Sequence, residues 1–204
     1  MNNHSIPFTK KPQKNNRGLL DWQLGNLSSN IILENKKLNV KLSRYLITRP
    51  NGDVLYDTIG ISEPKGNSVV VIKNTKGELG LIYEWRPIPE KWFWACVRGF
   101  GDPKDNGALD TAKREMIEEI GNCQIVSEKG LGGIYQNTTF YENPVQVVLL
   151  IVKDFDGKVS EDEGIKKMEF FSKQAISNMI KNEEIEDTFT LSALAKFLAT
   201  ENSL

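Results

Sequence analysis

The chain of 204 residues contains one histidine and two cysteines. The histidine, His4, stands in a polar N-terminal segment, so we expect neither Ser-His-Asp or Cys-His catalysis nor a histidine-based zinc site. Cys96 and Cys123 are far apart in the sequence and form no CxxC pair. This spacing indicates reduced thiols in a cytoplasmic protein rather than a disulfide framework.

The sequence also lacks a long apolar run and an excess of either charge. Its longest apolar stretch, around residues 145–152, is far shorter than the roughly 20 residues of a membrane span, and no secretory leader is visible. Lys and Arg total 26 against 27 Asp and Glu, so the positive field typical of nucleic-acid binding is missing. We therefore expect a cytoplasmic protein with no nucleic-acid or membrane partner.

The pattern along the chain predicts three segments. Residues 1–17 are rich in Asn and Lys and predict a flexible tail, residues 18–63 a small antiparallel β-sheet domain, and residues 64–204 a larger domain. Asn51-Gly52, between alternating apolar runs, is typical of a hairpin turn. A sheet this small is marginal alone, so it should pack on the rest of the chain or on a second subunit.

The larger segment alternates strand-like and helix-like patterns. We expect a hairpin formed by 68–72 and 79–83, a helix over 107–120 that stops at Gly121, strands at 124–127, 146–152 and 168–171, and helices at 173–181 and 187–198. Sheet and helix segments in this order predict an α+β fold arranged as an α/β/α sandwich.

The helix over 107–120 carries the chemically informative pattern. Glu115, Glu118 and Glu119 fall within about 100° of arc at helical spacing. The apolar residues assigned to another, core-facing side are Leu109, Ala112, Met116, Ile117 and Ile120. The carboxylates repel one another unless a cation offsets the charge, and oxygen ligands suit Mg²⁺ or Mn²⁺. A solvated acidic face is the alternative, but the preceding Gly-rich loop at 98–103 favours a metal or phosphate site.

The same segment resembles a known motif. Arg114-Glu115-x-x-Glu118-Glu119-x-Gly121, after Gly99-Phe100-Gly101, is similar to the Nudix box, Gly-x5-Glu-x7-Arg-Glu-hydrophobic-x-Glu-Glu-x-Gly-hydrophobic, of the Nudix hydrolases. The likeness extends over most of the chain. The segments that resemble the ADP-ribose pyrophosphatase branch are the hairpin at 51–52, the strand end at 84–87, the acidic segment at 161–163 and the start of the helix at 187–188. The resemblance implies a Nudix-type sandwich whose N-terminal sheet helps to form a homodimer.

The loop before the helix departs from the motif. Counting back from Arg114 places Asn106 at the first glutamate of the box and Phe100 at its glycine. Gly99 or Gly101 can take the glycine position only if one residue is inserted or deleted in the loop. The helix carboxylates themselves all match.

The resemblance implies an activity and a set of site residues. The activity is Mg²⁺-dependent hydrolysis, with Mn²⁺ as a further possibility, of the diphosphate linkage of ADP-ribose or a related nucleoside diphosphate sugar by a metal-activated water. The implied metal ligands are Glu115, Glu118 and Glu119. The implied substrate-binding residues are Arg86, Arg98, Gly99 and Gly101. The implied catalytic residues are Arg114, Glu118, Glu161 and Glu163, with Glu142 as a weaker choice for the base. Without a usable histidine, the general base must be a carboxylate or the metal-activated water itself.

Two alternatives remain open from the sequence. One keeps the chemistry but changes the substrate to a dinucleotide, NADH or a nucleoside triphosphate. The other is a non-catalytic module of the same fold that senses a nucleotide. Asn106 motivates the second alternative, and the three helix glutamates argue against it.

Overall fold

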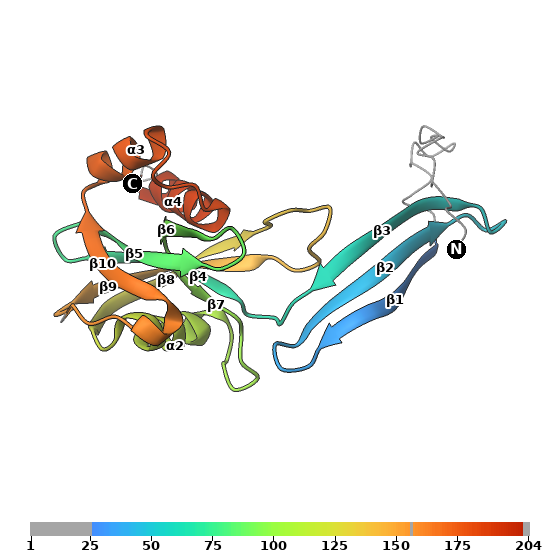
Figure 1. The fold of residues 1–204 in the computed structure, drawn as a ribbon, viewed down its shortest axis with the longest axis horizontal. Coiled ribbons are helices and arrows are strands. Elements are labelled where there is room, and N and C mark those ends of the chain that lie inside the picture. The colour runs from blue at the N-terminus through green and yellow to red at the C-terminus, as the bar shows by residue number, and fades with distance from the viewer. Residues whose placement is uncertain (1–25, 156, 202–204) are drawn as a thin grey trace. The chain divides into compact units, whose positions relative to one another are not determined.

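The computed structural model describes residues 26–155 and 157–201 of the chain (Figure 1). The expected tail at 1–17, His4 and the beginning of the N-terminal domain therefore lie outside the described residues. Internal contacts divide the chain into two units: residues 1–63 with 137–142, and residues 64–136 with 143–204. Each unit is described by itself.

The N-terminal unit contains an antiparallel three-stranded sheet, as expected. Its strands are β1 (Asn26–Asn35), β2 (Val40–Thr48) and β3 (Val54–Ser62), in the order β1-β2-β3. The predicted hairpin joins β2 to β3, with Gly52 at a φ of 89° and the N–H of Arg49 bonded to the carbonyl of Asp53 at 2.8 Å. Segment 137–142 lies against β3, where the N–H of Ile61 donates to the carbonyl of Phe140.

The larger unit is built on a seven-stranded mixed sheet. Its strands are β4 (Ser68–Asn74), β5 (Leu79–Arg86), β6 (Lys91–Ala95), β7 (Val97–Gly99), β8 (Gln124–Ile134), β9 (Val145–Lys153) and β10 (Ile165–Phe171). The order is β10-β5-β4-β9-β8, with β6 paired to β5 and β7 paired to β4. The β4–β9 pair is parallel and the other pairs are antiparallel.

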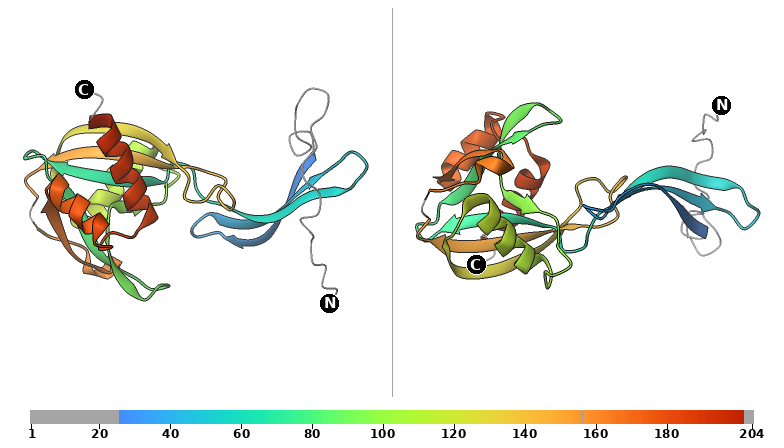
Figure 2. Two further views of the ribbon diagram at one scale, coloured as in Figure 1. Left: turned by 90° about the horizontal axis from the view of Figure 1, so that it is seen from above. Right: turned by 60° about the horizontal axis from the view of Figure 1, so that its bottom comes forward.

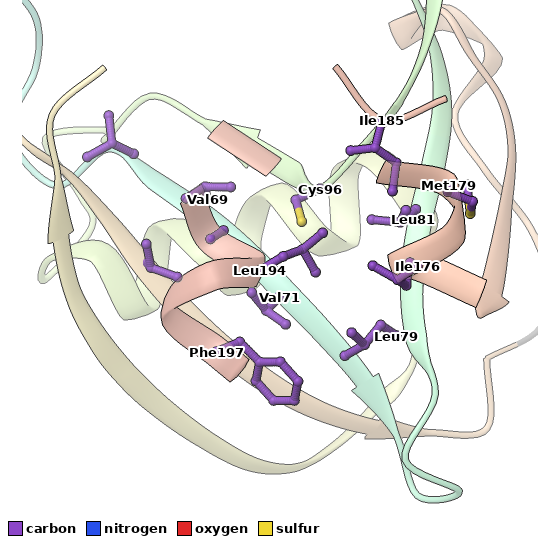
Figure 3. Close-up of a cluster of buried hydrophobic side chains, with 13 residues drawn as sticks. Val69, Val71, Leu79, Leu81, Cys96, Ile176, Met179, Ile185, Leu194 and Phe197 are labelled. Atoms are coloured by element: carbon purple, nitrogen blue, oxygen red, sulfur yellow. The ribbon is translucent and has the colours of Figure 1, made fainter. Parts of the chain in front are cut away.

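Helices cover both faces of this sheet. Helix α2 (Ala108–Ile120) lies on one face, and α3 (Lys173–Lys181) and α4 (Thr188–Glu201) lie on the other (Figures 1 and 2). Strand β4 supplies both cores by alternation, because Val69 and Val71 join the α3/α4 cluster of Figure 3 whereas Val70 and Ile72 join the α2 cluster. The expected α+β sandwich is confirmed.

The structure differs from the sequence prediction in several elements. Strands β6 and β7 were not predicted; they are short and lie in an aromatic and glycine-rich segment. Strand β8 runs well beyond the predicted 124–127, through bulges that include one between Gly130 and Gly132. On α2, Leu109 and Ile117 are exposed rather than buried, so the predicted core face of this helix was too wide.

Two further features concern the chain's environment. Within residues 26–155 and 157–201, no helix is long and apolar enough to cross a membrane. Cys96 is buried and Cys123 is half-buried, and the two form no disulfide with each other.

Candidate active site

The inner face of helix α2 is buried in the core and holds the helix carboxylates in place. It begins after Gly107, which has a φ of 108°, and ends at Gly121, whose N–H donates to the carbonyl of Ile117 at 3.0 Å. Three side chains of its inner face, Ala112, Met116 and Ile120, are completely buried. This packing fixes the rotation of the helix, so the positions of its carboxylates are set by the core.

Gly99, at the end of β7, leaves the space that the Glu115 carboxylate occupies. A Cβ atom at this position would lie 1.8 Å from the carboxyl carbon of Glu115 and 2.0–2.2 Å from its oxygens. Only a glycine allows this approach. Gly99 was expected to contact substrate, and the structure gives it a steric role toward Glu115.

Glu119 is the most buried carboxylate of the helix. Its Oε2 atom is buried without a hydrogen-bond partner among the described residues, and the carboxylate accepts a hydrogen bond from the backbone N–H of Arg98. Burial, reinforced by the nearby Glu84 and Glu115 carboxylates, raises the pKa of Glu119 to about 9. An unpaired buried carboxylate oxygen is costly and calls for a ligand.

Arg114 lies between the loop and the helix carboxylates. Its Nη1 donates to Glu115 at 2.6 Å and to Glu118 at 3.1 Å, and its Nη2 donates to the carbonyl of Phe100 at 2.7 Å. Its Nη2 also donates to Asp105 Oδ2 at 3.0 Å. The loop therefore supplies a carboxylate to this arginine at Asp105, six residues after Gly99, and not at Asn106, whose side chain is exposed.

The environment of Glu115 combines opposing effects. Burial raises its pKa, Arg114 lowers it, and the carboxylates of Glu118 and Glu163 raise it to a smaller extent. The balance is a pKa above the ordinary range. Glu163 therefore lies near enough to Glu115 for its charge to raise the pKa of that carboxyl.

The end of β5 adds a buried acid that sequence reasoning had not assigned to the site. Arg86 Nη2 lies 2.5 Å from Glu84 Oε1, and Glu84 is only 4% exposed. The Nε of Arg86 is buried without a hydrogen-bond partner in the described part of the chain. A charged residue within the apolar run of β5 was the available signal for Glu84.

Arg98 has a different setting from Arg86. Its Nη1 donates to Asp187 at 3.0 Å, and its guanidinium carbon lies 4.5 Å from the centre of the Phe189 ring. Asp187 also caps α4, because it accepts from the N–H and the hydroxyl of Thr190 at 2.9 and 2.7 Å. The Arg98 side chain is therefore tied to the start of α4, while its backbone contacts Glu119.

Gly101 is explained by packing of the loop. A Cβ atom there would lie 2.2 Å from the carbonyl oxygen of Lys65, and its N–H donates to Asn67 Oδ1 at 3.0 Å. Its expected contact with substrate stays a prediction.

The acidic segment 161–163 forms a 3₁₀ turn, η1 (Glu161–Glu163), between β9 and β10. The N–H of Ser160 donates to the carbonyl of Glu119 at 2.8 Å, and the N–H of Trp85 donates to the carbonyl of Gly164 at 3.0 Å. These bonds anchor both ends of the turn beside α2 and β5. Glu142, the weaker choice for the base, belongs to the N-terminal unit, where it accepts a hydrogen bond from Tyr45.

The expected metal ligands are not gathered into a ready-made cluster. Among the described residues, no group of three or more Asp, Glu, Cys or His side chains is arranged to hold a metal ion. Arg114 engages Glu115 and Glu118, whereas Glu119 keeps an unpartnered oxygen. Hard carboxylate oxygens, one of them buried and unsatisfied, fit a Mg²⁺-like cation. The assignment of the ligands stays a prediction.

The burial of Glu119 predicts how a metal-free variant behaves. Because the pKa of this carboxyl is raised in the folded chain, folding takes up a proton, and stability falls as pH rises from about 4.5 to about 9. Glu119→Gln should remove this penalty and raise the metal-free unfolding free energy at pH 8 by about 1–3 kcal/mol. The difference should shrink toward pH 5. Denaturation at both pH values measures it.

Glu118→Gln is the matched control, because the Glu118 side chain is 53% exposed. It should change metal-free stability by less than about 0.5 kcal/mol. A Glu119→Gln variant that is less stable than the parent at pH 8 would contradict the proposed environment of Glu119.

Comparison with known proteins places this geometry in a family. Residues 64–192, more than half of the chain, match the family model of the NUDIX domain. The fold is similar to a crystal structure of an ADP compounds hydrolase, with a TM-score of 0.69 and 15% sequence identity over 96% of this chain and 98% of that chain. No curated protein matches the sequence. At this identity the structural likeness shows the fold alone, the Nudix sandwich with a small N-terminal sheet, and the domain match shows that the chain belongs to the Nudix family of pyrophosphohydrolases.

Proposed function

We propose that this chain hydrolyses the diphosphate linkage of ADP-ribose or a related nucleoside diphosphate sugar with the help of Mg²⁺. The observation that carries the proposal is the buried, unpartnered oxygen of Glu119 beside Glu115, on the helix that matches the family motif. The likeness to a crystal structure of an ADP compounds hydrolase supports an ADP-containing substrate.

The helix carboxylates would hold the cation. Glu119 offers its free Oε2, Glu115 lies beside it against Gly99, and the more exposed Glu118 would complete the site directly or through water. Bound Mg²⁺ would neutralise the diphosphate and lower the pKa of a water. Mn²⁺ satisfies the same oxygen ligands. Arg114 would act by orienting Glu115 and Glu118 through its two hydrogen bonds.

Arg86 is the better placed of the two arginines for contact with a phosphate. Its Nη2 is paired with Glu84 while its Nε remains a buried donor without a partner. A phosphate oxygen would satisfy this donor, and a planar guanidinium suits that contact. Arg98 is engaged by Asp187 and Phe189, so its backbone N–H, bonded to Glu119, is its present contribution to the site.

Glu163 is our choice for the general base. It is exposed on an anchored turn, and its charge acts on Glu115, which shows that it lies near the helix carboxylates. It would take a proton from the water whose oxygen attacks phosphorus. The bridging P–O bond breaks, and two phosphate-bearing products leave.

We also propose a cytoplasmic location for the chain, because Cys96 and Cys123 form no disulfide with each other.

The activity is tested with a substrate panel. With Mg²⁺, we expect ADP-ribose to yield AMP and ribose 5-phosphate faster than NADH, a dinucleoside polyphosphate or a nucleoside triphosphate is cleaved. Glu119→Gln should lower the rate at least about 100-fold, because it removes a direct metal ligand. Product separation by chromatography gives the rates. Nucleotide binding without turnover of any compound would contradict the proposal and support a sensing module.

The base is tested by neutralising each acid of the η1 turn separately. Glu163→Gln should lower kcat by about 100-fold or more, since general-base catalysis contributes on that order. Glu161→Gln, the same change two residues away, should retain most of the activity. The opposite ranking would move the role to Glu161.

We also propose that a second copy of the chain covers β1. Every residue of this edge strand is exposed, and Leu27, Ile31, Ile32 and Leu33 are each more than half exposed. A three-stranded sheet with such an edge is marginal alone and gains stability by pairing.

Light scattering should therefore give twice the chain mass of 23.1 kDa. The double variant Ile31→Lys/Leu33→Lys should be monomeric, because it places charge on the proposed interface. Val126→Lys, at an exposed apolar site of the larger unit, is the control and should remain dimeric. A parent chain that is monomeric at micromolar concentration would refute the dimer.

A further inference from the structure

The turn that carries Glu163 is closed by backbone hydrogen bonds. The N–H of Glu163 donates to the carbonyl of Ser160 at 3.2 Å, and the N–H of Gly164 donates to the carbonyl of Glu161 at 2.9 Å. Gly164 has a φ of 75°, in the left-handed region that glycine adopts without strain. The position of Glu163 therefore follows from where Ser160 and Gly164 are held.

Ser160 is held by helix α2. Its N–H donates to the carbonyl of Glu119 at 2.8 Å. The last carbonyls of a helix have no partner within the helix, so this bond also satisfies one of them. The φ of Ser160 is −84°, and its side chain makes no capping hydrogen bond to the turn. The link from the turn to α2 therefore passes through the backbone N–H of Ser160.

Gly164 is held by strand β5. Its carbonyl accepts a hydrogen bond from the N–H of Trp85 at 3.0 Å, and Trp85 stands between Glu84 and Arg86 in the chain. A Cβ atom at Gly164 would lie 3.6 Å from the carbonyl oxygen of Trp85, which is an ordinary contact. The constraint at this position is thus the φ angle and not the space. A residue that avoids this φ must rotate the backbone and lose the bond to Trp85.

We propose that Ser160 and Gly164 are positioning residues that fix Glu163 relative to Glu119, Ser160 through α2 and Gly164 through β5. This inference rests on the proposed role of Glu163 as the general base. One backbone network then connects the base to a metal ligand, so their separation is set before a substrate binds. Such positioning matters, because a displacement of about 1 Å can lower a rate by about 100-fold.

The link to α2 is tested at Ser160. Proline has a φ near −65° and no N–H, so Ser160→Pro removes the donor to Glu119 at a compatible backbone angle. It should lower kcat for ADP-ribose with Mg²⁺ by about 10–100-fold, while calorimetric titration without nucleotide gives a Kd for Mn²⁺ within about twofold of the parent chain. Ser160→Ala, the conservative variant, keeps the N–H and should recover the loss.

The link to β5 is tested at Gly164. Gly164→Val disfavours the observed φ, so it should lower kcat by about 10-fold or more and remove the protection of the Trp85 amide against hydrogen exchange. Asparagine tolerates this φ, so Gly164→Asn should recover most of the activity. Gly157→Val is the matched control. Gly157 has a φ of 80° in the same β9–β10 connection, and a side chain there has nothing within 4 Å. This variant should keep the parent kcat and the protected Trp85 amide.

A double variant separates positioning of the base from a general loss of structure. If Gly164 acts through Glu163, Gly164→Val should lower kcat no further in a chain that already carries Glu163→Gln. A full additional loss, an equal loss in Gly157→Val, or an unchanged kcat in both Ser160→Pro and Gly164→Val overturns the inference and leaves the proposed reaction intact. A parent chain that cleaves no nucleotide refutes the reaction and the positioning role together.

Discussion

Burial of the Glu119 carboxylate is the constraint on which the arrangement of the site depends. The group is held where water cannot solvate it, and its pKa rises to about 9 because of that burial and of the nearby Glu84 and Glu115. The chain tolerates this cost because the other face of α2 is anchored by completely buried side chains, Met116 and Ile120 among them. The apolar core thus stabilises an unfavourable electrostatic arrangement that a cation would relieve.

The positive charges that balance the carboxylates of the site come from arginines that lie next to them. The chain as a whole is nearly neutral, yet Arg114 and Arg86 each sit against carboxylates at the ends of different elements. Arg114 also donates to the Phe100 carbonyl of the loop, and Arg86 pairs with Glu84 on its own strand. Such pairs lower the repulsion among the acids while they fix the directions of the oxygens.

The sequence was sufficient to predict the helices and strands whose apolar and polar residues follow a strong periodic pattern. The acidic helix, the Asn51-Gly52 hairpin and the two C-terminal helices were placed to within a few residues, because helical spacing and turn residues are local signals. Leu109 and Ile117 were misplaced, since periodicity gives the direction of a side chain but not the point where the neighbouring sheet ends. Glu84 was missed as a member of the site because its position beside Glu119 depends on the pairing of distant strands, which no local pattern encodes.

The most instructive difference concerns the loop before the helix. Counting back from Arg114 with a fixed spacing put Asn106 where the motif has a carboxylate, and this motivated the non-catalytic alternative, against which the three helix glutamates argued. In the structure Asp105 occupies that role toward Arg114, six residues after the glycine that admits Glu115. One additional residue between Asp105 and Arg114 leaves both contacts intact, because a loop can absorb an insertion that a helix cannot. The asparagine at position 106 therefore reflects a one-residue change in loop spacing, not the loss of the loop carboxylate. The observation that motivated a non-catalytic module is thereby explained.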